Sequence, residues 1–410
     1  MQQHLVVVGG GAAGFFCAIN AARMNPQLKV TIVEKSNKVL SKVKVSGGGR
    51  CNVTHDCTDI QELVKRYPRG QNFLKKSFHW FNTIHTIDWF KERGVLLKVE
   101  ADGRMFPSNN SSQTIIDCLL KELNEYKVEL KLGFDVNSIE QANNQFQLKT
   151  TDLRQLSADY LCIASGGYPK ATQFEWLKKV GHSIENPVPS LFTFNIPNNT
   201  ITQLMGVSVE LAQIKIISSK LNYAGPLLIT HWGLSGPAVL KLSAYGARDL
   251  ANTNYHFKIL VNWLTQYNEQ TLKEEWLHLR QQYSSNKIHN KNPFGLPNRL
   301  WLHLLTICNI NEELRWADIN AKQQNQLIKN LTAQEFEVKG KTTFKEEFVT
   351  CGGIQLNEVD ANSMQSKIIP QLFFAGEVLD IDGITGGFNF QNAWTSGFIA
   401  AKSIAQLSIQ

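Results

Sequence analysis

The 410-residue sequence has no long apolar run, few cysteines, and no repeat or low-complexity segment. No apolar run approaches the roughly 20 residues that span a bilayer, so we expect no membrane association. The seven cysteines are odd in number and scattered, without the spacing of a zinc site. This excludes a disulfide framework and predicts reduced thiols, no bound metal and a cytoplasmic protein.

The sequence also shows no cleavable leader, because the first strand of the fold is expected to start at about residue 4. The 42 Lys and Arg outnumber the 35 Asp and Glu, giving a net charge of +7. This excess is compatible with a polyanionic partner and equally with a solvated basic surface. A chain of this length suits two or three domains rather than a single core.

What the sequence does have, almost at once, is a nucleotide-binding turn. An apolar strand, Leu5 to Val8, is followed by Gly-Gly-Gly-Ala-Ala-Gly at 9–14, a helix-like segment and a second strand that ends in Glu34. This is G-x-G-x-x-G between strand and helix, with an acid 20 residues after the last glycine. Gly9 permits the turn, Gly11 lets the backbone approach a pyrophosphate, and Gly14 lets the helix pack on the strand. The helix N-terminus then faces the phosphates.

Glu34 is placed to accept hydrogen bonds from the ribose hydroxyls of an adenosine, and its charge would repel the 2′-phosphate of NADP. Three further segments favour FAD over NAD. Leu372–Glu377 is a final strand that ends in Gly376 and Glu377, suited to the ribityl and pyrophosphate part of a flavin. Gly383, Gly386 and Gly387 precede the last helix, whose N-terminus could face the flavin ring. A third segment, Ser46–Asn52, contains three consecutive glycines where a backbone must nearly touch a flat group.

The order of strand-like and helix-like segments along the sequence predicts an α/β fold with an insertion. We expect a Rossmann-like FAD-binding domain of the glutathione-reductase type, formed by residues 1–189 and 350–410, with the last strand returning to the first sheet. Short strands predict a β-barrel-like domain over 190–264 and 333–349. Three helical segments predict a three-helix insert over 265–332.

Several motifs together resemble the HI0933-like (BaiN/RdsA-type) family of FAD-dependent, NAD(P)-linked oxidoreductases. They occur in family order along essentially the whole chain: Ser-Gly-Gly-Gly-Arg-Cys-Asn at 46–52, Asp-Gly-Arg-Met-Phe-Pro at 102–107, Thr-His-Trp-Gly-Leu-Ser-Gly-Pro at 230–237, Thr-Cys-Gly-Gly-Ile at 350–354, and Ala-Gly-Glu-Val-Leu-Asp-Ile-Asp-Gly-Ile-Thr-Gly-Gly-Phe-Asn at 375–389.

This resemblance implies the same discontinuous FAD-binding domain with a barrel-like insertion. It implies activities such as reduction of conjugated C=C bonds, in bile acid enones or in uridine of 23S ribosomal RNA, and in one branch amine oxidation. With the glycine turn, it predicts a set of cofactor-binding residues: Gly9, Gly11, Ala13, Gly14, Glu34, Lys42, Gly48, Gly49, Arg50, Cys51, Asn52, Val136, Gly166, Gly376, Glu377, Asp382, Gly386, Gly387, Phe388 and Asn389.

The sequence departs from the family pattern at two places. The family usually has Gly and a basic residue before Lys42, where this chain has Leu40 and Ser41. After Gly166-Gly167 the usual Ser/Thr- and Gly-rich stretch is replaced by Tyr168–Phe174. The identity of the substrate is therefore more open than that of the flavin.

Reduction of an activated C=C bond needs a hydride and a proton donor. Cys51 follows the glycine triplet and is one candidate acid, with a packing role as the alternative. His231 is the second candidate, since histidine titrates near neutrality, with a structural role beside Trp232 as the alternative. NAD(P)H is expected to donate electrons transiently, because no second glycine fingerprint provides a docking domain.

Two basic stretches bear on an RNA substrate. Lys65 to Phe81 interleaves basic and aromatic residues, as RNA recognition requires, but also as an amphipathic helix with buried aromatics would. Arg280 to Arg299 contains no acid and reads equally as a solvated loop. The leading hypothesis is an FAD-dependent reductase of an activated double bond, with ribosomal RNA as a possible substrate. The alternatives are an FAD-dependent amine oxidase and an RNA-binding flavoprotein without turnover; the sequence leaves the oligomeric state open.

Overall fold

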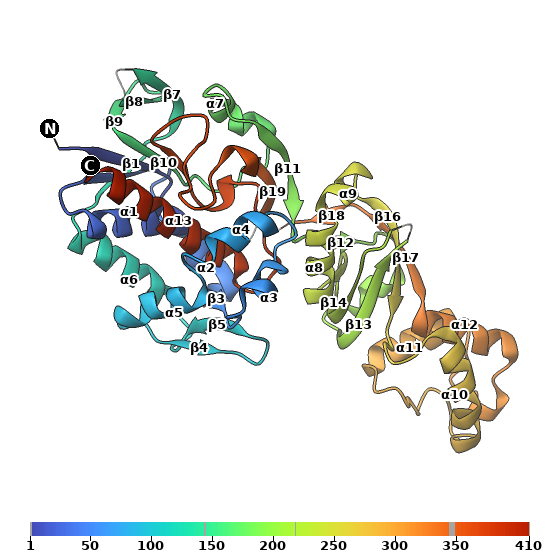
Figure 1. Cartoon of the computed structure of the whole chain (residues 1–410). Helices are drawn as coiled ribbons and strands as arrows, with labels where there is room; N and C mark the ends of the chain where they lie inside the picture. Colours follow the sequence, from blue (N-terminus) through green and yellow to red (C-terminus); the bar gives the residue numbers. More distant parts are fainter. Residues whose placement is uncertain (1, 143–144, 218, 344–348, 410) are drawn as a thin grey trace. The chain divides into compact units, whose positions relative to one another are not determined.

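The structure is a computed structural model that describes residues 2–142, 145–217, 219–343 and 349–409. The chain divides into two compact units, the first made of residues 1–190 and 344–410 and the second of residues 191–343 (Figure 1). The first unit therefore contains both ends of the chain.

A five-stranded parallel sheet with the order β20-β10-β1-β2-β6 forms the centre of the first unit. Strands β1, β2, β10 and β20 are apolar and mostly buried, as expected for a parallel sheet covered on both faces, whereas the edge strand β6 is partly exposed. The strands are β1 (His4–Val8), β2 (Lys29–Glu34), β6 (Glu129–Leu132), β10 (Tyr160–Ile163) and β20 (Leu372–Phe374). This confirms the predicted Rossmann-like α/β fold, and it confirms that the last strand returns to the first sheet.

Helices α1 and α13 pack against each other beside this sheet (Figure 1). Their contact is close because the position of a Cβ on Gly397 would lie 2.7 Å from the carbonyl oxygen of Ala13. The α-helices of the unit are α1 (Ala12–Met24), α2 (Ser41–Gly49), α3 (Ile60–Val64), α4 (Gln71–Ser77), α5 (Thr83–Glu92), α6 (Ser112–Glu125), α7 (Glu175–Lys178) and α13 (Phe388–Leu407).

Three small antiparallel sheets complete the first unit, in the orders β3-β5-β4, β7-β8-β9 and β11-β19. Their strands are β3 (Thr54–His55), β4 (Leu97–Val99), β5 (Arg104–Pro107), β7 (Val136–Ala142), β8 (Gln145–Thr150), β9 (Gln155–Ala158), β11 (Ile184–Ser190) and β19 (Val349–Ile354). The chain leaves the first unit at the end of β11 and has returned to it by the start of β19.

The second unit is built on a seven-stranded sheet with the order β17-β16-β13-β14-β15-β12-β18. The strands are β12 (Thr193–Asn195), β13 (Ser208–Ile216), β14 (Asn222–Thr230), β15 (Gly233–Ser235), β16 (His256–Asn262), β17 (Gln334–Lys339) and β18 (Lys341–Thr342). Residues 208–216 form the single strand β13, with an irregularity in its register between Val209 and Ala212.

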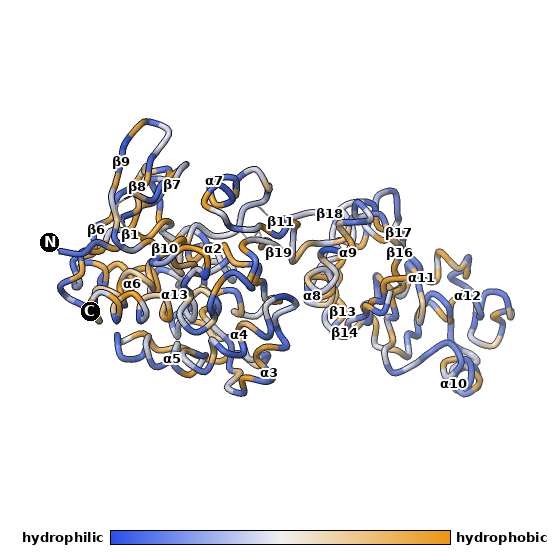
Figure 2. The backbone as a smooth tube through the Cα atoms, turned by 45° about the horizontal axis from the view of Figure 1, so that its top comes forward, coloured by the Kyte–Doolittle hydropathy of each residue, from blue (hydrophilic) through white to orange (hydrophobic). Residues whose placement is uncertain are grey.

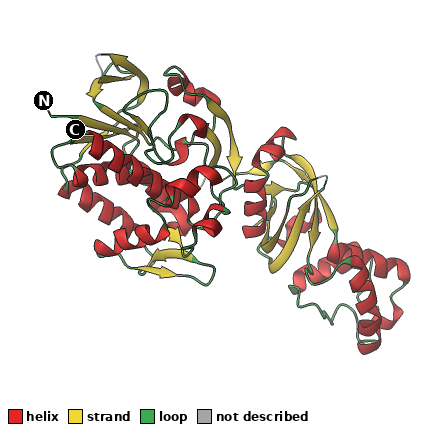
Figure 3. Cartoon of the chain, viewed as in Figure 1, coloured by secondary structure: helices red, strands yellow, loops and turns green. Residues whose placement is uncertain are grey.

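Helices α8 (Pro237–Tyr245) and α9 (Ala247–Asn252) follow β15, and three longer helices lie between β16 and β17 in the chain. These three are α10 (Glu269–Gln282), α11 (Asn298–Ile307) and α12 (Ala321–Thr332), and they group together beyond the strands of the unit (Figure 3). Fully buried Trp276, Trp301 and Trp316 form the centre of the group, with ring centroids of Trp276 and Trp316 5.1 Å apart.

Many apolar residues lie within the helices and strands of both units, and many of the connections are hydrophilic (Figure 2). Among the described residues, no helix combines the length and the apolar character needed to cross a membrane.

The α1–α13 contact makes a prediction with a definite sign. An Ala in place of Gly inside a helix normally adds about 0.5–1 kcal/mol of stability. At Gly397 we expect the opposite, a loss of about 1 kcal/mol or more, because the new methyl group would meet the backbone of α1 and overpacking costs about 1–3 kcal/mol. Urea unfolding of Gly397→Ala measures the difference. Ser403→Ala, on the half-buried part of the same helix, is the control and should change stability by less than about 0.5 kcal/mol. Stabilisation by Gly397→Ala would contradict the close packing.

Candidate functional site

The carboxyl ends of three neighbouring strands meet at one edge of the central sheet. Val8 of β1 pairs with Ile163 of β10, and Ile163 pairs with Phe374 of β20. The strands continue from there into the Gly9 turn, the 164–167 turn and the 375–377 turn. The chain runs from β1 to β2 on one side, whereas β10 lies on the other, and ligands of such sheets bind where the order reverses. The candidate site therefore lies at the ends of β1 and β10.

The three fingerprint glycines have different surroundings in this turn. A Cβ on Gly9, whose φ is +117°, would lie 2.3 Å from the carbonyl oxygen of Ala164, and one on Gly14 would lie 2.0 Å from that of Gly9. Gly11 precedes α1, and no atom lies within 4 Å of the position of its Cβ. Gly9 and Gly14 thus allow close packing, while Gly11 borders free space at the N-terminus of α1. A pyrophosphate is the kind of group that such a helix end binds.

Glu34 lies at the end of β2, beside this turn. Its Oε2 accepts a hydrogen bond from the Gly10 N–H at 2.7 Å, and its Oε1 accepts one from the Ser36 N–H at 2.9 Å. A carboxylate has about four acceptor sites, so two remain for ribose hydroxyls. Both bonds fix the orientation of the carboxylate, which is what a ribose-binding acid needs.

The predicted glycine triplet forms the irregular end of α2. Ser46 leaves the helical conformation, and Gly47, Gly48 and Gly49 all have positive φ, at +58°, +68° and +83°. No atom lies within 4 Å of the Cβ positions of Gly48 and Gly49. The backbone is therefore bare at this point, and a flat ligand can approach it.

The basic residues that we predicted near the cofactor are held by acids of the protein. Arg50 lies 2.6 Å from Glu100 and stacks on Phe106, with its guanidinium 4.0 Å from the ring centroid. Lys42 lies 2.7 Å from Glu377. Because these charges are already paired, the backbone N–H groups of the glycine turn are the main candidates for binding the phosphates.

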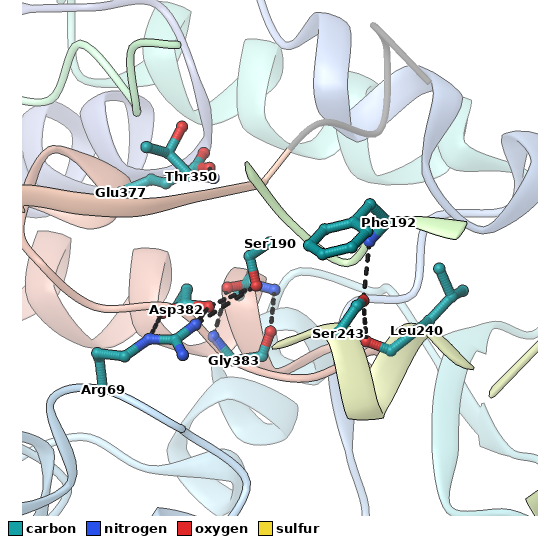
Figure 4. A network of polar contacts seen from close by, with 10 residues as sticks. Arg69, Ser190, Phe192, Leu240, Ser243, Thr350, Glu377, Asp382 and Gly383 are labelled. Carbon is teal, nitrogen blue, oxygen red and sulfur yellow. Dashed lines mark hydrogen bonds and ion pairs between the residues drawn. The ribbon is translucent and has the colours of Figure 1, made fainter. Parts of the chain in front are cut away.

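Glu377 connects three segments that are distant in the sequence. Besides Lys42, its carboxylate binds the backbone N–H of Thr350 at 2.8 Å (Figure 4). The Thr350 hydroxyl is buried and has no hydrogen-bond partner among the described residues, and a Cβ on Gly167 would lie 2.5 Å from it. A buried hydroxyl without a partner, packed against the 164–167 turn, fits a polar ligand. The residues present therefore fit a dinucleotide such as FAD; Thr350 lies in a motif of the family resemblance, but we had not predicted it as a site residue.

The loop before α13 is closed by asparagines. Asn389 accepts from the Gly383 N–H at 2.8 Å and donates to the Gly383 carbonyl at 2.9 Å. The Asn52 amide, oriented to satisfy its neighbours, accepts from the Gly387 N–H and donates to the Thr54 carbonyl, both at 3.0 Å. Asn52 thereby joins the glycine triplet region to the N-terminus of α13. Gly386 has a φ of +137° and lies against the Phe388 ring.

Asp382 is fully buried in the same loop. It forms an ion pair with Arg69, and its Oδ2 accepts from the Ser190 hydroxyl at 2.6 Å (Figure 4). Burial raises the pKa of the Asp382 carboxyl, and the nearby Arg69 charge opposes that rise. Since both oxygens contact protein groups, this network orders the loop from within; a direct contact of Asp382 with the cofactor stays a prediction.

The two candidate proton donors have very different environments. Cys51 is buried, and burial raises the pKa of its thiol to about 12, so it stays protonated at neutral pH. His231 is exposed in the turn between β14 and β15, with its ring 4.2 Å from that of Trp232. His231 belongs to the second unit. The cofactor cradle, formed by the Gly9–Gly14 turn, Glu34, the glycines at 47–49 and the 375–377 turn, belongs to the first unit. Of the other predicted residues, Val136 begins β7, where it pairs with Thr150, and Ala13 lies against Gly376.

The fold and this cradle define a class: a Rossmann-like, FAD-binding oxidoreductase. The chain belongs to the HI0933-like family, since the family model described as "HI0933-like protein Rossmann domain" matches residues 3–403. This membership makes it an FAD-dependent enzyme.

Curated relatives match the chain from end to end. It is 27% identical to the ribosomal RNA dihydrouridine synthase of Escherichia coli over an alignment of 406 residues that covers 97% of each protein. It is 25% identical to the 3-dehydro-bile acid delta(4,6)-reductase of Clostridium scindens over 425 residues, covering 99% of this chain and 100% of that protein. The solved 3-ketosteroid delta1-dehydrogenase of Sterolibacterium denitrificans shares the fold, with a TM-score of 0.53, 13% identity and coverage of 98% and 99%.

The space beside Gly11 predicts that Gly11→Ala weakens FAD binding without harming the fold. The added methyl group meets no protein atom, but it would occupy the space proposed for the pyrophosphate. An overlap of this kind costs about 1–3 kcal/mol, or about a fivefold to hundredfold loss of affinity. Titration of the apoprotein with FAD and thermal unfolding of the apoprotein measure the two effects. Gly9→Ala is the comparison and should lower the stability of the apoprotein as well; unchanged FAD affinity in Gly11→Ala would place the pyrophosphate elsewhere.

The buried ion pair gives a second prediction. Arg69→Met leaves the Asp382 carboxylate buried without its cation, so we expect a loss of about 3–5 kcal/mol in urea unfolding. Adding Asp382→Asn should recover most of that loss because it removes the buried charge. The control is Lys65→Met, in the exposed pair with Glu62, which should cost no more than about 1 kcal/mol. Equal effects of Arg69→Met and Lys65→Met would show that the buried pair contributes nothing special.

Proposed function

We propose that this enzyme reduces an activated carbon–carbon double bond, and that its substrate is a uridine of 23S ribosomal RNA, converted to dihydrouridine. The observation that carries the proposal is end-to-end similarity to proteins named for such reductions, a ribosomal RNA dihydrouridine synthase and a bile acid delta(4,6)-reductase. Both names describe saturation of a conjugated C=C bond. The chain departs from the family's usual residues at 40–41 and 168–174, so the choice between the two substrates rests on further arguments.

Bound FAD would supply the hydride for one carbon of the double bond, with NAD(P)H as the transient source of electrons. The protein must hold the dinucleotide and supply a proton to the other carbon. Gly11, Gly48 and Gly49 are the residues that leave room for the cofactor, and Glu34 would hold its ribose. The thiol of Cys51 and the imidazole of His231 remain the candidate proton donors; at a pKa of about 12 the thiol is a weak acid.

The second unit is proposed to be a barrel-like domain with a helical insert. Its sheet order has β17 at one end and β18 at the other, yet β12, the neighbour of β18, also contacts β17. Contact between the two ends of a sheet favours closure. Helices α10 to α12 lie between β16 and β17 in the chain, as an insert would.

A steroid-like enone is the second candidate substrate, favoured by the similarity to the bile acid reductase over the full length of that protein. RNA is preferred because the exposed side of the Lys65–Phe81 stretch is basic and the whole chain carries a net charge of +7. The RNA substrate, the steroid-like substrate and the amine oxidase alternative differ in whether ribosomal RNA is modified in the cell and in which compound reduces the flavin.

We predict that deletion of the gene removes one dihydrouridine from 23S ribosomal RNA, detected by mass spectrometry of rRNA fragments. Complementation with the wild-type gene should restore it, and complementation with Gly11→Ala should restore it only poorly, because that variant is expected to bind FAD weakly. An unchanged modification map after deletion would refute the RNA substrate.

Anaerobic mixing with NADPH or NADH separates the remaining hypotheses. Bleaching of the flavin by a reduced nicotinamide supports a reductase, whereas bleaching by a primary amine alone would identify an amine oxidase.

A further inference from the structure

The surface of the first unit contains a cavity of about 590 Å³ between α4 and the 356–367 segment. Its walls include Pro68, Gly70, Asn72, Lys76, Asn357 and Lys367. None of these residues belongs to the predicted cofactor set. The two walls are fixed to each other, since the Ser77 hydroxyl donates to the Ala361 carbonyl at 2.9 Å and the Trp80 indole N–H donates to Asn362 Oδ1 at 3.2 Å.

The charged side chains of this cavity favour an anion. Lys76 and Lys367 are exposed lysines, and the Lys367 ammonium donates to the Asn357 carbonyl at 3.0 Å. Within the described part of the chain, neither lysine forms an ion pair with a carboxylate. Asp360 is the only acid among the lining residues, and its oxygens already accept from the Asn362 N–H at 3.0 Å and the Ser363 hydroxyl at 3.1 Å. Two cations against one carboxylate leave the lining with a net positive charge, and Asn72 and Asn357 add amide groups to it.

An exposed aromatic ring lies next to the cavity. Of the aromatic residues in the Lys65–Phe81 stretch, Tyr67, Phe73, Phe78 and Phe81 are buried, whereas Trp80 is 46% exposed. The Lys402 ammonium lies 4.0 Å from the centroid of the Trp80 ring. An exposed indole is a surface on which an unpaired base can stack.

The cavity also adjoins the loop that precedes α13. A Cβ on Gly70, in its wall, would lie 2.7 Å from Ile381, and the neighbouring Arg69 holds Asp382. Residues 380–387 form the loop that we expect to face the flavin ring. A chain bound between Trp80 and Gly70 would thus extend toward the expected reactive end of the cofactor.

We infer that this cavity binds the sugar–phosphate backbone of a single-stranded RNA segment next to the target uridine. Lys76 and Lys367 would contact phosphates, the asparagine amides would bind ribose or base edges, and Trp80 would stack a base. The inference rests on the proposed RNA substrate and adds where on the protein that substrate binds.

The test measures binding of a short, uridine-rich, fluorescein-labelled single-stranded RNA to the FAD-loaded protein by fluorescence anisotropy, over a series of salt concentrations. Lys76→Gln/Lys367→Gln should weaken binding about tenfold, and the slope of log affinity against log salt should fall by about 1.4, since each phosphate contact to a single strand contributes about 0.7. Trp80→Ala should weaken binding at least about fivefold with little change in slope.

Two control variants keep this test specific. Lys121→Gln/Lys127→Gln removes the same charge from exposed lysines, one in α6 and one just after it, and should leave the slope unchanged. Lys76→Arg/Lys367→Arg keeps the charge and should retain most of the affinity. Thermal unfolding and the FAD spectrum of every variant establish that it is folded and loaded.

The outcomes separate this inference from the proposed function. Wild-type RNA binding that depends on Lys76 and Lys367, without any dihydrouridine formed, would uphold the cavity and refute the activity. Dihydrouridine formation with normal RNA binding by the glutamine double variant would uphold the activity and overturn the cavity. Displacement of the RNA by NADPH, with a raised KM for NADPH in the double variant, would also overturn the inference, because the lysines would then serve the electron donor. Equal weakening of RNA binding by Lys76→Gln/Lys367→Gln and by Lys121→Gln/Lys127→Gln would also overturn the inference, because the effect would then come from the general charge of the protein.

Discussion

The close approach of backbone to backbone at the ends of the central strands is the constraint on which the first unit depends. Gly14 packs on the carbonyl of Gly9, Gly9 on that of Ala164, and Gly397 on that of Ala13, each at a distance that no side chain could occupy. These contacts bring the ends of β1 and β10 and the helices α1 and α13 into one compact arrangement. Where this packing stops, at Gly11, Gly48 and Gly49, the backbone remains bare. Packing and ligand space are thus two consequences of the same small residues.

The electrostatics of the cradle follow a related logic. Arg50, Lys42 and Arg69, three of the cations closest to the predicted site, are each held by a carboxylate of the protein. A pyrophosphate placed here would be bound mainly by backbone N–H groups and the dipole of α1, whose positions are set by the fold. The paired cations instead join segments that are distant in the chain, as Lys42 does with Glu377. Their role in the structure is to fix geometry rather than to present free charge.

The sequence predicted the parts of the fold that local patterns encode. The β1–α1–β2 unit and the return of β20 were predicted correctly because apolar runs, glycines and the terminal acid lie next to one another in the chain. No helix was predicted where α8 lies, although it begins at Pro237 and proline is favoured at the first position of a helix. The partners of Asp382, Arg69 and Ser190, lie 313 and 192 residues away in the sequence. No local pattern reveals such pairs, and the same holds for the orphan hydroxyl of Thr350.

The two basic stretches show why composition does not locate a binding surface. Both are basic and free of acids in the sequence, yet in the second unit Lys287 pairs with Glu313 and Arg299 donates to the carbonyls of Gln203 and Met205. Two basic residues of that stretch therefore contact other groups of the protein. In the first unit the aromatic residues turn inward while Lys75 and Lys76 stay exposed. Because a polyanion responds to exposed, unpaired charge, the first stretch is the better candidate for RNA contact, a difference that net charge alone would hardly show.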